Sequence, residues 1–140
     1  MNFLQNYYLN STAGVDLLIA THEAKRAIRD SGVKNGLLTV LVTNGSAGVA
    51  LLENDVKLIE QFKDFIVRLV PEPEKKPARP SRRSGSGHDF VNLRAALVGA
   101  NVSLPIKDSK LVMGAWQDLV VLDFDDKIGR REITIQITGE

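Results

Sequence analysis

Polar side chains at the two ends of one short apolar segment are the first candidates for chemistry in this sequence. Asn44 and Ser46 precede the apolar residues 47–52, and Glu53 and Asn54 follow them. Asn44 and Ser46 can donate hydrogen bonds to an anion, and Glu53 can orient or deprotonate a substrate. The same residue types also form turns and helix starts. The sequence leaves both interpretations open.

The sequence Gly114-Ala115-Trp116-Gln117 is the second candidate, because it is a polar corner between two apolar segments. A glycine followed by an aromatic and an amide side chain can present a flat ring and hydrogen bonds to a planar heterocycle. The alternative is a tryptophan in the core, with its N–H bonded to a backbone carbonyl.

A third group of side chains has the chemistry of an anion site. Arginine binds phosphate in a bidentate geometry, so these residues could form an anion pocket. Ordinary surface ion pairs are the alternative. The group contains Asn92, Arg94, Asp123, Arg130 and Arg131.

Composition excludes several classes of function. The chain has 140 residues, 44% of them hydrophobic, a formal charge of +1 and no cysteine. These values predict one soluble cytoplasmic domain without disulfides, and the near-zero charge argues against a nucleic-acid partner. No apolar segment is long enough to span a bilayer and the start does not resemble a signal peptide, so we expect no membrane partner. Only His22 and His88 titrate near neutral pH unaided.

Hydrophobic periodicity predicts the elements that must position these residues. A helix should begin at Thr21, capped by its hydroxyl, and end at Ser31 and Gly32. A second should run from Asp55 to Pro71, and a third over residues 90–98. Strands are predicted over residues 2–9, 37–42, 47–52, 103–106, 111–113, 118–124 and 132–138, whereas 15–19 suits either a strand or a helix approach. The predicted class is α+β with a mostly antiparallel or mixed sheet packed against about three helices.

Two details of this prediction concern the strands. The run 37–42 is almost continuously apolar, which is typical of a strand covered on both faces. The short polar corner 44–46 between it and the next strand predicts a hairpin or a sharp sheet edge.

Residues 71–89 form a Pro/Arg/Ser/Gly-rich segment that we expect to be a flexible internal loop of the single domain 1–140. A solvated loop is the simpler interpretation, although its cations could contact an acidic partner or a phosphate. Its lack of aromatic residues argues against single-stranded nucleic acid. Its cations are Lys75, Lys76, Arg79, Arg82 and Arg83.

Taken in order, several of these segments resemble the YjbQ family over nearly the whole chain. They are residues 31–37, the corner 44–48, Glu53-Asn54, residues 69–71, residues 93–99, Gly114-Ala115-Trp116-Gln117 and residues 130–140. The resemblance implies a small domain that assembles as a homotrimer. It also implies a secondary thiamine-phosphate synthase activity, which joins a pyrimidine diphosphate to a thiazole phosphate.

The sequence departs from the family pattern at its histidines. The family has histidine where this chain has Asn44, and a His-x-His where it has Phe90-Val91-Asn92. Amide oxygens are weak ligands for zinc-like ions, so we expect no metal and no cofactor. His88 is a candidate partial replacement for the lost pair. Asp123 matches the acidic residue that the family carries on a late strand.

Two hypotheses follow. In the first, Ser46 and Glu53 are catalytic, Arg94 and the corner hold phosphate, and Trp116 stacks on a ring. In the second, the protein is a non-catalytic trimeric ligand-binding or assembly protein that has lost the site histidines. Where a ligand is bound, it should be a small phosphorylated or heterocyclic molecule held by Asn44, Asn54, Asn92, Arg94, Trp116, Gln117 and Asp123.

Overall fold

The computed structural model describes residues 1–12, 14–73 and 89–140. The elements in chain order are β1 (Asn2–Ser11), β2 (Asp16–Ile19), α1 (Thr21–Ser31), β3 (Gly36–Val42), β4 (Ala47–Glu53), α2 (Val56–Leu69), α3 (Asp89–Val98), β5 (Asn101–Lys107), β6 (Lys110–Leu111), β7 (Gln117–Asp123) and β8 (Gly129–Gly139). Three helices and antiparallel strands confirm the predicted α+β class.

The strands form two separate sheets. The larger has the order β1-β8-β3-β5-β6, and the smaller has the order β2-β7-β4. Every strand pair among the described residues is antiparallel, for example Leu38 with Ile137 and Ala50 with Val120. Strands β3 and β4 lie in different sheets, so the corner 44–46 carries the chain from one sheet to the other and is not a hairpin.

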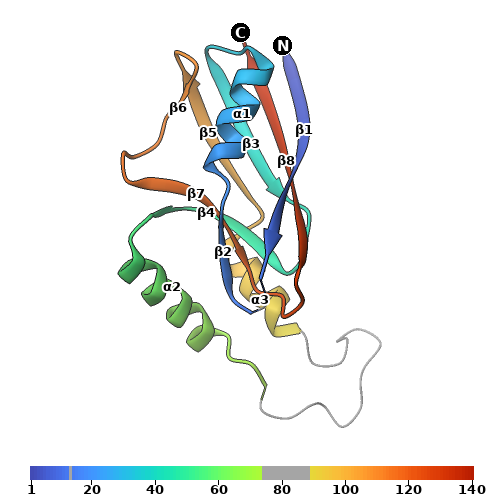
Figure 1. The fold of residues 1–140 in the computed structure, drawn as a ribbon, viewed down its shortest axis with the longest axis vertical. Coiled ribbons are helices and arrows are strands. Elements are labelled where there is room, and N and C mark those ends of the chain that lie inside the picture. Colours follow the sequence, from blue (N-terminus) through green and yellow to red (C-terminus); the bar gives the residue numbers. More distant parts are fainter. Residues whose placement is uncertain (13, 74–88) are drawn as a thin grey trace.

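The main core fills the space between the two sheets and α1. Leu38, Val40 and Ile135 of the larger sheet, together with Val121 of the smaller, are at most 1% exposed. Helix α1 adds Ala24, Ala27 and Ile28 to this core, and it lies over the larger sheet in Figure 1. The alternation of apolar and polar residues along β8 therefore buries one face of the larger sheet.

A second core covers the other face of the smaller sheet. It joins Ile66 of α2 and Val91 and Ala95 of α3 to Val120 and Leu122 of β7. Strand β7 is thus packed on both faces, and residues 119–123 are all buried. The polar side chain at the end of this strand, Asp123, is enclosed by the same packing.

The structure differs from the sequence prediction at β3. Leu38, Val40 and Val42 are buried, whereas Leu37 is 44% and Leu41 is 39% exposed. The expectation of a strand covered on both faces was therefore wrong for this strand in a single chain. Strand β7 is the one that is covered on both faces. The larger sheet covers one face of the smaller sheet, and α2 and α3 cover the other.

The start of α1 also differs from the prediction. Ala20 is the N-cap residue and no side chain caps the helix. The Thr21 hydroxyl instead donates to Oδ1 of Asp118 at 2.7 Å and accepts from the backbone N–H of Leu119 at 2.9 Å. It joins α1 to β7 because the strand offers a partner on each side of the hydroxyl.

The remaining elements agree with the prediction to within three residues at each end, although β6 covers only the first residue of the strand predicted over 111–113. Residues 16–19 are a strand, Gly32 ends α1 in the left-handed conformation, and Asp55 caps α2. Residues 74–88 of the predicted loop lie outside the described residues, including its five cations and His88. In the described ranges, no helix has the length and hydropathy needed to cross a membrane.

Candidate polar pocket at the sheet corner

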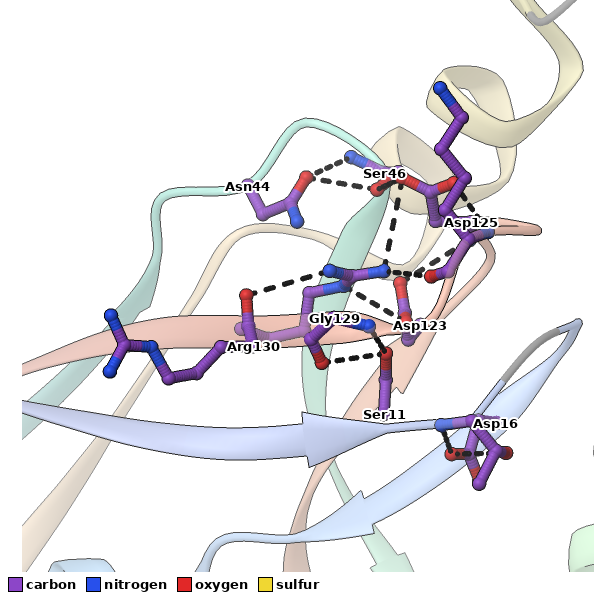
Figure 2. Close-up of polar contacts among 11 residues, drawn as sticks. Ser11, Asp16, Asn44, Ser46, Asp123, Asp125, Gly129 and Arg130 are labelled. Carbon is purple, nitrogen blue, oxygen red and sulfur yellow. Dashed lines mark hydrogen bonds and ion pairs between the residues drawn. The ribbon is translucent and has the colours of Figure 1, made fainter.

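The loop between β3 and β4 is held in a tight corner by the side chain of Asn44. Its Oδ1 accepts hydrogen bonds from the backbone N–H of Ser46 at 3.1 Å and from the Ser46 hydroxyl at 2.9 Å (Figure 2). The same hydroxyl oxygen lies 3.3 Å from Oδ2 of Asp125, a second acceptor for its single proton. Ser46 is 6% exposed, so its hydroxyl fixes the corner within the fold.

A buried ion pair between Arg131 and Asp123 lies next to the corner. Nε of Arg131 donates to Oδ2 of Asp123 at 3.0 Å, and the two side chains are 7% and 0% exposed. Nη2 of the same guanidinium donates to the carbonyl of Lys127 at 2.7 Å and lies 3.9 Å from Oδ2 of Asp125. Figure 2 shows Asp123 and Asp125 beside Ser46. Arg131 thereby holds the turn between β7 and β8 against the corner.

Asp125 is held in its charged form by this arrangement. Its pKa is lowered chiefly because the backbone N–H of Lys127 donates to it at 3.0 Å. Desolvation opposes this, whereas Asp126, Arg131 and Ser46 lower the pKa further. A carboxylate of low pKa accepts hydrogen bonds well but is a weak general base. Asp125 therefore suits ligand binding better than activation of the Ser46 hydroxyl.

Asn44, Ser46 and Asp125 line a pocket of about 300 Å³ at the corner, which we call the corner pocket. Asn92, in the first turn of α3, faces the corner, since a Cβ on Gly45 would lie 3.7 Å from its Oδ1. Asn44, Gly45 and Asn92 also line an adjoining hollow of about 310 Å³. The corner pocket is lined by Asn44, Gly45, Ser46, Val91, Asn92, Asp125, Asp126 and Lys127.

The residues of the corner pocket do not fit a metal ion of the zinc type. The Oδ1 atom of Asn44 already accepts two hydrogen bonds, and a carboxamide oxygen is a weak ligand. Among the described residues, no group of three or more His, Cys, Asp or Glu side chains is placed to hold a metal.

The other half of the predicted site lies at the far end of β4. Glu53 pairs with Gln117 across the sheet, the backbone N–H of Asn54 donates to the carbonyl of Trp116 at 3.0 Å, and Asn54 Nδ2 donates to Asp118 at 3.0 Å. Strand β4 has seven residues, so Ser46 and Glu53 lie ~20 Å apart. The two proposed catalytic residues therefore do not share a site within one chain.

The structure contradicts one of the two arrangements that the sequence suggested for Trp116, and the other, a ring presented to a planar heterocycle, stays a prediction. Trp116 is 80% exposed, so the core interpretation was wrong. Oε1 of Gln117 accepts the backbone N–H of Gly114 at 2.8 Å, which makes the amide a support for its own turn. The far-end cluster contains the exposed Glu53, Asn54 and Trp116 and the half-buried Gln117, where β4 ends and β7 begins.

Arg94 lies apart from both groups. Its Nε donates to the carbonyl of Val70 at 2.8 Å, its guanidinium lies 4.9 Å from the centre of the Phe90 ring, and it is 4% exposed. Burial lowers the pKa of this guanidinium, against the attraction of Glu72. Arg94 joins α3 to the end of α2 and is not among the residues that line the corner pocket.

Three lining residues were missed from the sequence, namely Asp125, Asp126 and Lys127. A signal existed: these polar residues follow the buried strand that carries Asp123, with only Phe124 between them and the strand. The turn that follows such a strand lies close to the residues that contact the last side chain of the strand, which here is Asp123. The partner of Asp123 could also have been inferred, because the alternation that turns Ile133 and Ile135 inward puts Arg131 on the same face.

The fold and the pocket define an α+β protein of two antiparallel sheets with a polar hollow where the chain passes between them. A family model described as UPF0047 protein YjbQ-like matches residues 5–140. The chain belongs to this family. A UPF0047 protein of Synechocystis sp. is 30% identical over 139 residues, covering 97% of this chain and 92% of the relative. Another, from Methanocaldococcus jannaschii, is 26% identical and covers 100% of this chain and 97% of its own.

Solved structures show the same fold. A protein of unknown function from Sulfolobus solfataricus superposes with a TM-score of 0.87 at 24% identity, covering 100% of this chain and 99% of its own. A hypothetical protein from Aeropyrum pernix gives a TM-score of 0.86 at 22% identity, with 99% of both chains covered. At these identities the likeness concerns the fold alone.

Proposed function

We propose that the corner pocket binds a small uncharged or cationic heterocycle and does not transform it. The observation that carries this proposal is the set of polar groups in the pocket. The carboxamides of Asn44 and Asn92 supply amide groups, Asp125 supplies a charged acceptor and Lys127 a donor. Such a mixture suits the edge of an aminopyrimidine-like ring, whose amino groups donate and whose ring nitrogens accept.

Charge favours this ligand over a phosphate. Asp125 and Asp126 outnumber Lys127 among the charged lining residues. The neighbouring Arg131 is already engaged with Asp123, Asp125 and the carbonyl of Lys127. The pocket is therefore net acidic, and a free phosphate would approach the Asp125 carboxylate without a bidentate arginine to offset the repulsion.

The same geometry argues against the transferase reaction that the family resemblance implies. Ser46 has no histidine or other strong base beside it in the described part of the chain, and Asp125 is a weak base. Glu53 is far from the pocket. The second hypothesis, a ligand-binding protein that has lost the site histidines, is therefore the better supported of the two.

Calorimetric titration tests the proposal. We expect saturable binding of cytosine to the wild-type protein, with weaker or no binding of inorganic phosphate, pyrophosphate and thiamine phosphate. Asn92→Ala and Asp125→Asn should each weaken cytosine binding roughly tenfold, whereas Glu53→Ala, the matched control at the far end of β4, should not. Pyrophosphate release from a pyrimidine diphosphate and a thiazole phosphate, abolished by Ser46→Ala, would instead establish the transferase.

We further propose a homotrimer in which copies meet through the outer face of the larger sheet. Arg130, Glu132 and Lys107 lie toward the ends of this face, and its middle carries uncharged side chains over four strands. Depletion of charge is typical of interface cores. Three leucines on this face are exposed in the single chain, which supports its role as an interface. They are Leu4 at 63%, Leu37 at 44% and Leu41 at 39% exposed. Light scattering should give three copies for the wild type and one for Leu41→Lys, and a monomeric wild type would contradict the proposal. The other residues of the face are Asn6, Thr39, Asn101, Ser103, Pro105, Thr134, Gln136 and Thr138.

A further inference from the structure

A second polar pocket, of about 520 Å³, lies between β1 and α1. It contains two buried oxygen atoms, the Tyr7 hydroxyl and Oε2 of Glu23, that have no hydrogen-bond partner within the described residues. Tyr7 itself is 6% exposed. An unpaired buried polar atom is costly, and two of them on the wall of one hollow indicate a ligand that supplies hydrogen bonds. The pocket is lined by Gln5, Asn6, Tyr7, Tyr8, Glu23, Arg26 and Asp30.

The charges of this pocket define the sign of that ligand. Glu23 and Asp30 contribute two negative charges and Arg26 one positive charge. Arg26 is partly neutralised, since its Nε lies 3.9 Å from Oδ2 of Asp30. An anion would meet a net negative wall. Water could complete the hydrogen bonds of the two unpaired oxygens, but it would leave the charge uncompensated.

The two unpaired oxygen atoms, of Tyr7 and Glu23, indicate which kind of hydrogen-bond donor the ligand must carry. Both are oxygens that can accept, and an ionised carboxylate can only accept. A primary ammonium carries three donors on one small atom, so one group can serve both oxygens. The face of the Tyr7 ring, with Arg26 5.8 Å from its centre, shows that this wall already tolerates a cation. Burial, aided by Asp30 and opposed by Arg26, raises the pKa of Tyr7, which keeps the phenol neutral.

We infer that this pocket, formed by Tyr7, Glu23 and Asp30, binds the primary ammonium group of a small alkylamine. The bound nitrogen donates to the Tyr7 hydroxyl and to Oε2 of Glu23. Asp30, seven residues after Glu23 and so two helical turns along the same face of α1, adds long-range attraction. The site is independent of the corner pocket and of the function proposed for it.

The experiment is a titration of the wild-type protein with n-butylammonium chloride at constant ionic strength, followed by amide NMR shifts. We expect saturable shifts of residues 5–8 and 23–30. n-Butanol, which has the same chain without the charge, should give none. Tetramethylammonium, which has no N–H donor, should bind at least tenfold more weakly. Equal binding of butanol would overturn the proposal.

Two variants separate binding from folding. Tyr7→Phe removes the unpaired hydroxyl, so we expect affinity to fall roughly threefold to tenfold while the melting temperature does not fall. Glu23→Gln should weaken binding more, by roughly tenfold or greater, and Glu60→Gln on α2 is the matched control. Affinity unchanged in both pocket variants, or absence of saturable shifts in the wild type, would overturn the inference.

Discussion

Strand β4 has a polar cluster at each end, and the two clusters differ in burial and in charge pairing. At its start, Ser46 is 6% exposed and backed by the buried Asp123–Arg131 pair. At its end, Glu53 is exposed and Trp116 is 80% exposed. Both clusters contain residue types suited to binding. Only the first is enclosed by the turn between β7 and β8 and by α3, so enclosure distinguishes the pocket from the exposed edge.

The largest expected difference between the two ends comes from Asp123. Asp123→Ala leaves the Arg131 guanidinium buried without its partner, which costs about 3–5 kcal/mol of unfolding free energy. Denaturant unfolding measures this loss. The control at the other end, Glu53→Ala, should change stability by less than ~0.5 kcal/mol.

The double variant Asp123→Leu with Arg131→Met makes this prediction sharper. Replacing both charges by apolar side chains leaves no buried charge unpaired, and it should recover most of the lost stability. Equal stability of Asp123→Ala and wild type would show that the pair does not hold the corner.

Glycines near the two ends give the second comparison. A Cβ on Gly48 would lie 2.7 Å from Val98 side-chain atoms and 2.9 Å from the backbone oxygen of Gly99. Since backbone cannot move aside easily, Gly48→Ala should cost about 1–3 kcal/mol. A Cβ on Gly114 meets only the side chain of Gln117, at 3.0 Å, and Gly114→Ala should cost less than ~1 kcal/mol. Thermal unfolding of the two variants side by side tests the order, and a reversed order would contradict the tighter packing at the first end.

A third, smaller effect depends on pH. The folded-state pKa of Asp125 is lowered, chiefly by the Lys127 N–H, so its contribution to stability is present above the ordinary carboxyl value and is lost as the pH falls through the lowered one. Asp125→Asn should therefore cost about 1 kcal/mol between pH 6 and 8. The difference from wild type should shrink below about pH 4. Urea unfolding at both pH values measures it, and a difference independent of pH would show that the charge of Asp125 is not what stabilises the turn.

The sequence predicted most of the fold, because hydrophobic period identifies elements and Gly32 and Asp55 mark helix ends. It did not predict what covers each face. The apolar runs of β3 and β7 look alike, yet Leu41 is 39% exposed and Leu122 is fully buried. Coverage depends on the order of strands in two sheets, which no local pattern contains.

The candidate site was predicted by residue type but not by grouping. Asn44, Ser46 and Asn92 meet at one corner although 48 positions separate the outer two. Glu53 and Trp116 were assigned to the same site, but a seven-residue strand holds them away from it. Arg94 has the charge expected of a residue that binds phosphate, but its Nε donates a hydrogen bond to the carbonyl of Val70. The distances between these residues depend on the order of the strands and helices in the fold, and the amino-acid composition does not determine them.

The smallest expected effect, that of Trp116→Ala, is also the sharpest test of how the two ends relate. The bond that Trp116 makes to Asn54 uses its backbone carbonyl, which alanine retains, and the indole is largely exposed. We therefore expect a change in unfolding free energy within ~0.5 kcal/mol and unaltered cytosine affinity at the corner pocket. If calorimetry showed that Trp116→Ala abolishes binding while unfolding is unchanged, the independence of the two ends would fail. The ring would then have to reach the pocket of another copy, because within one chain the strand keeps them apart.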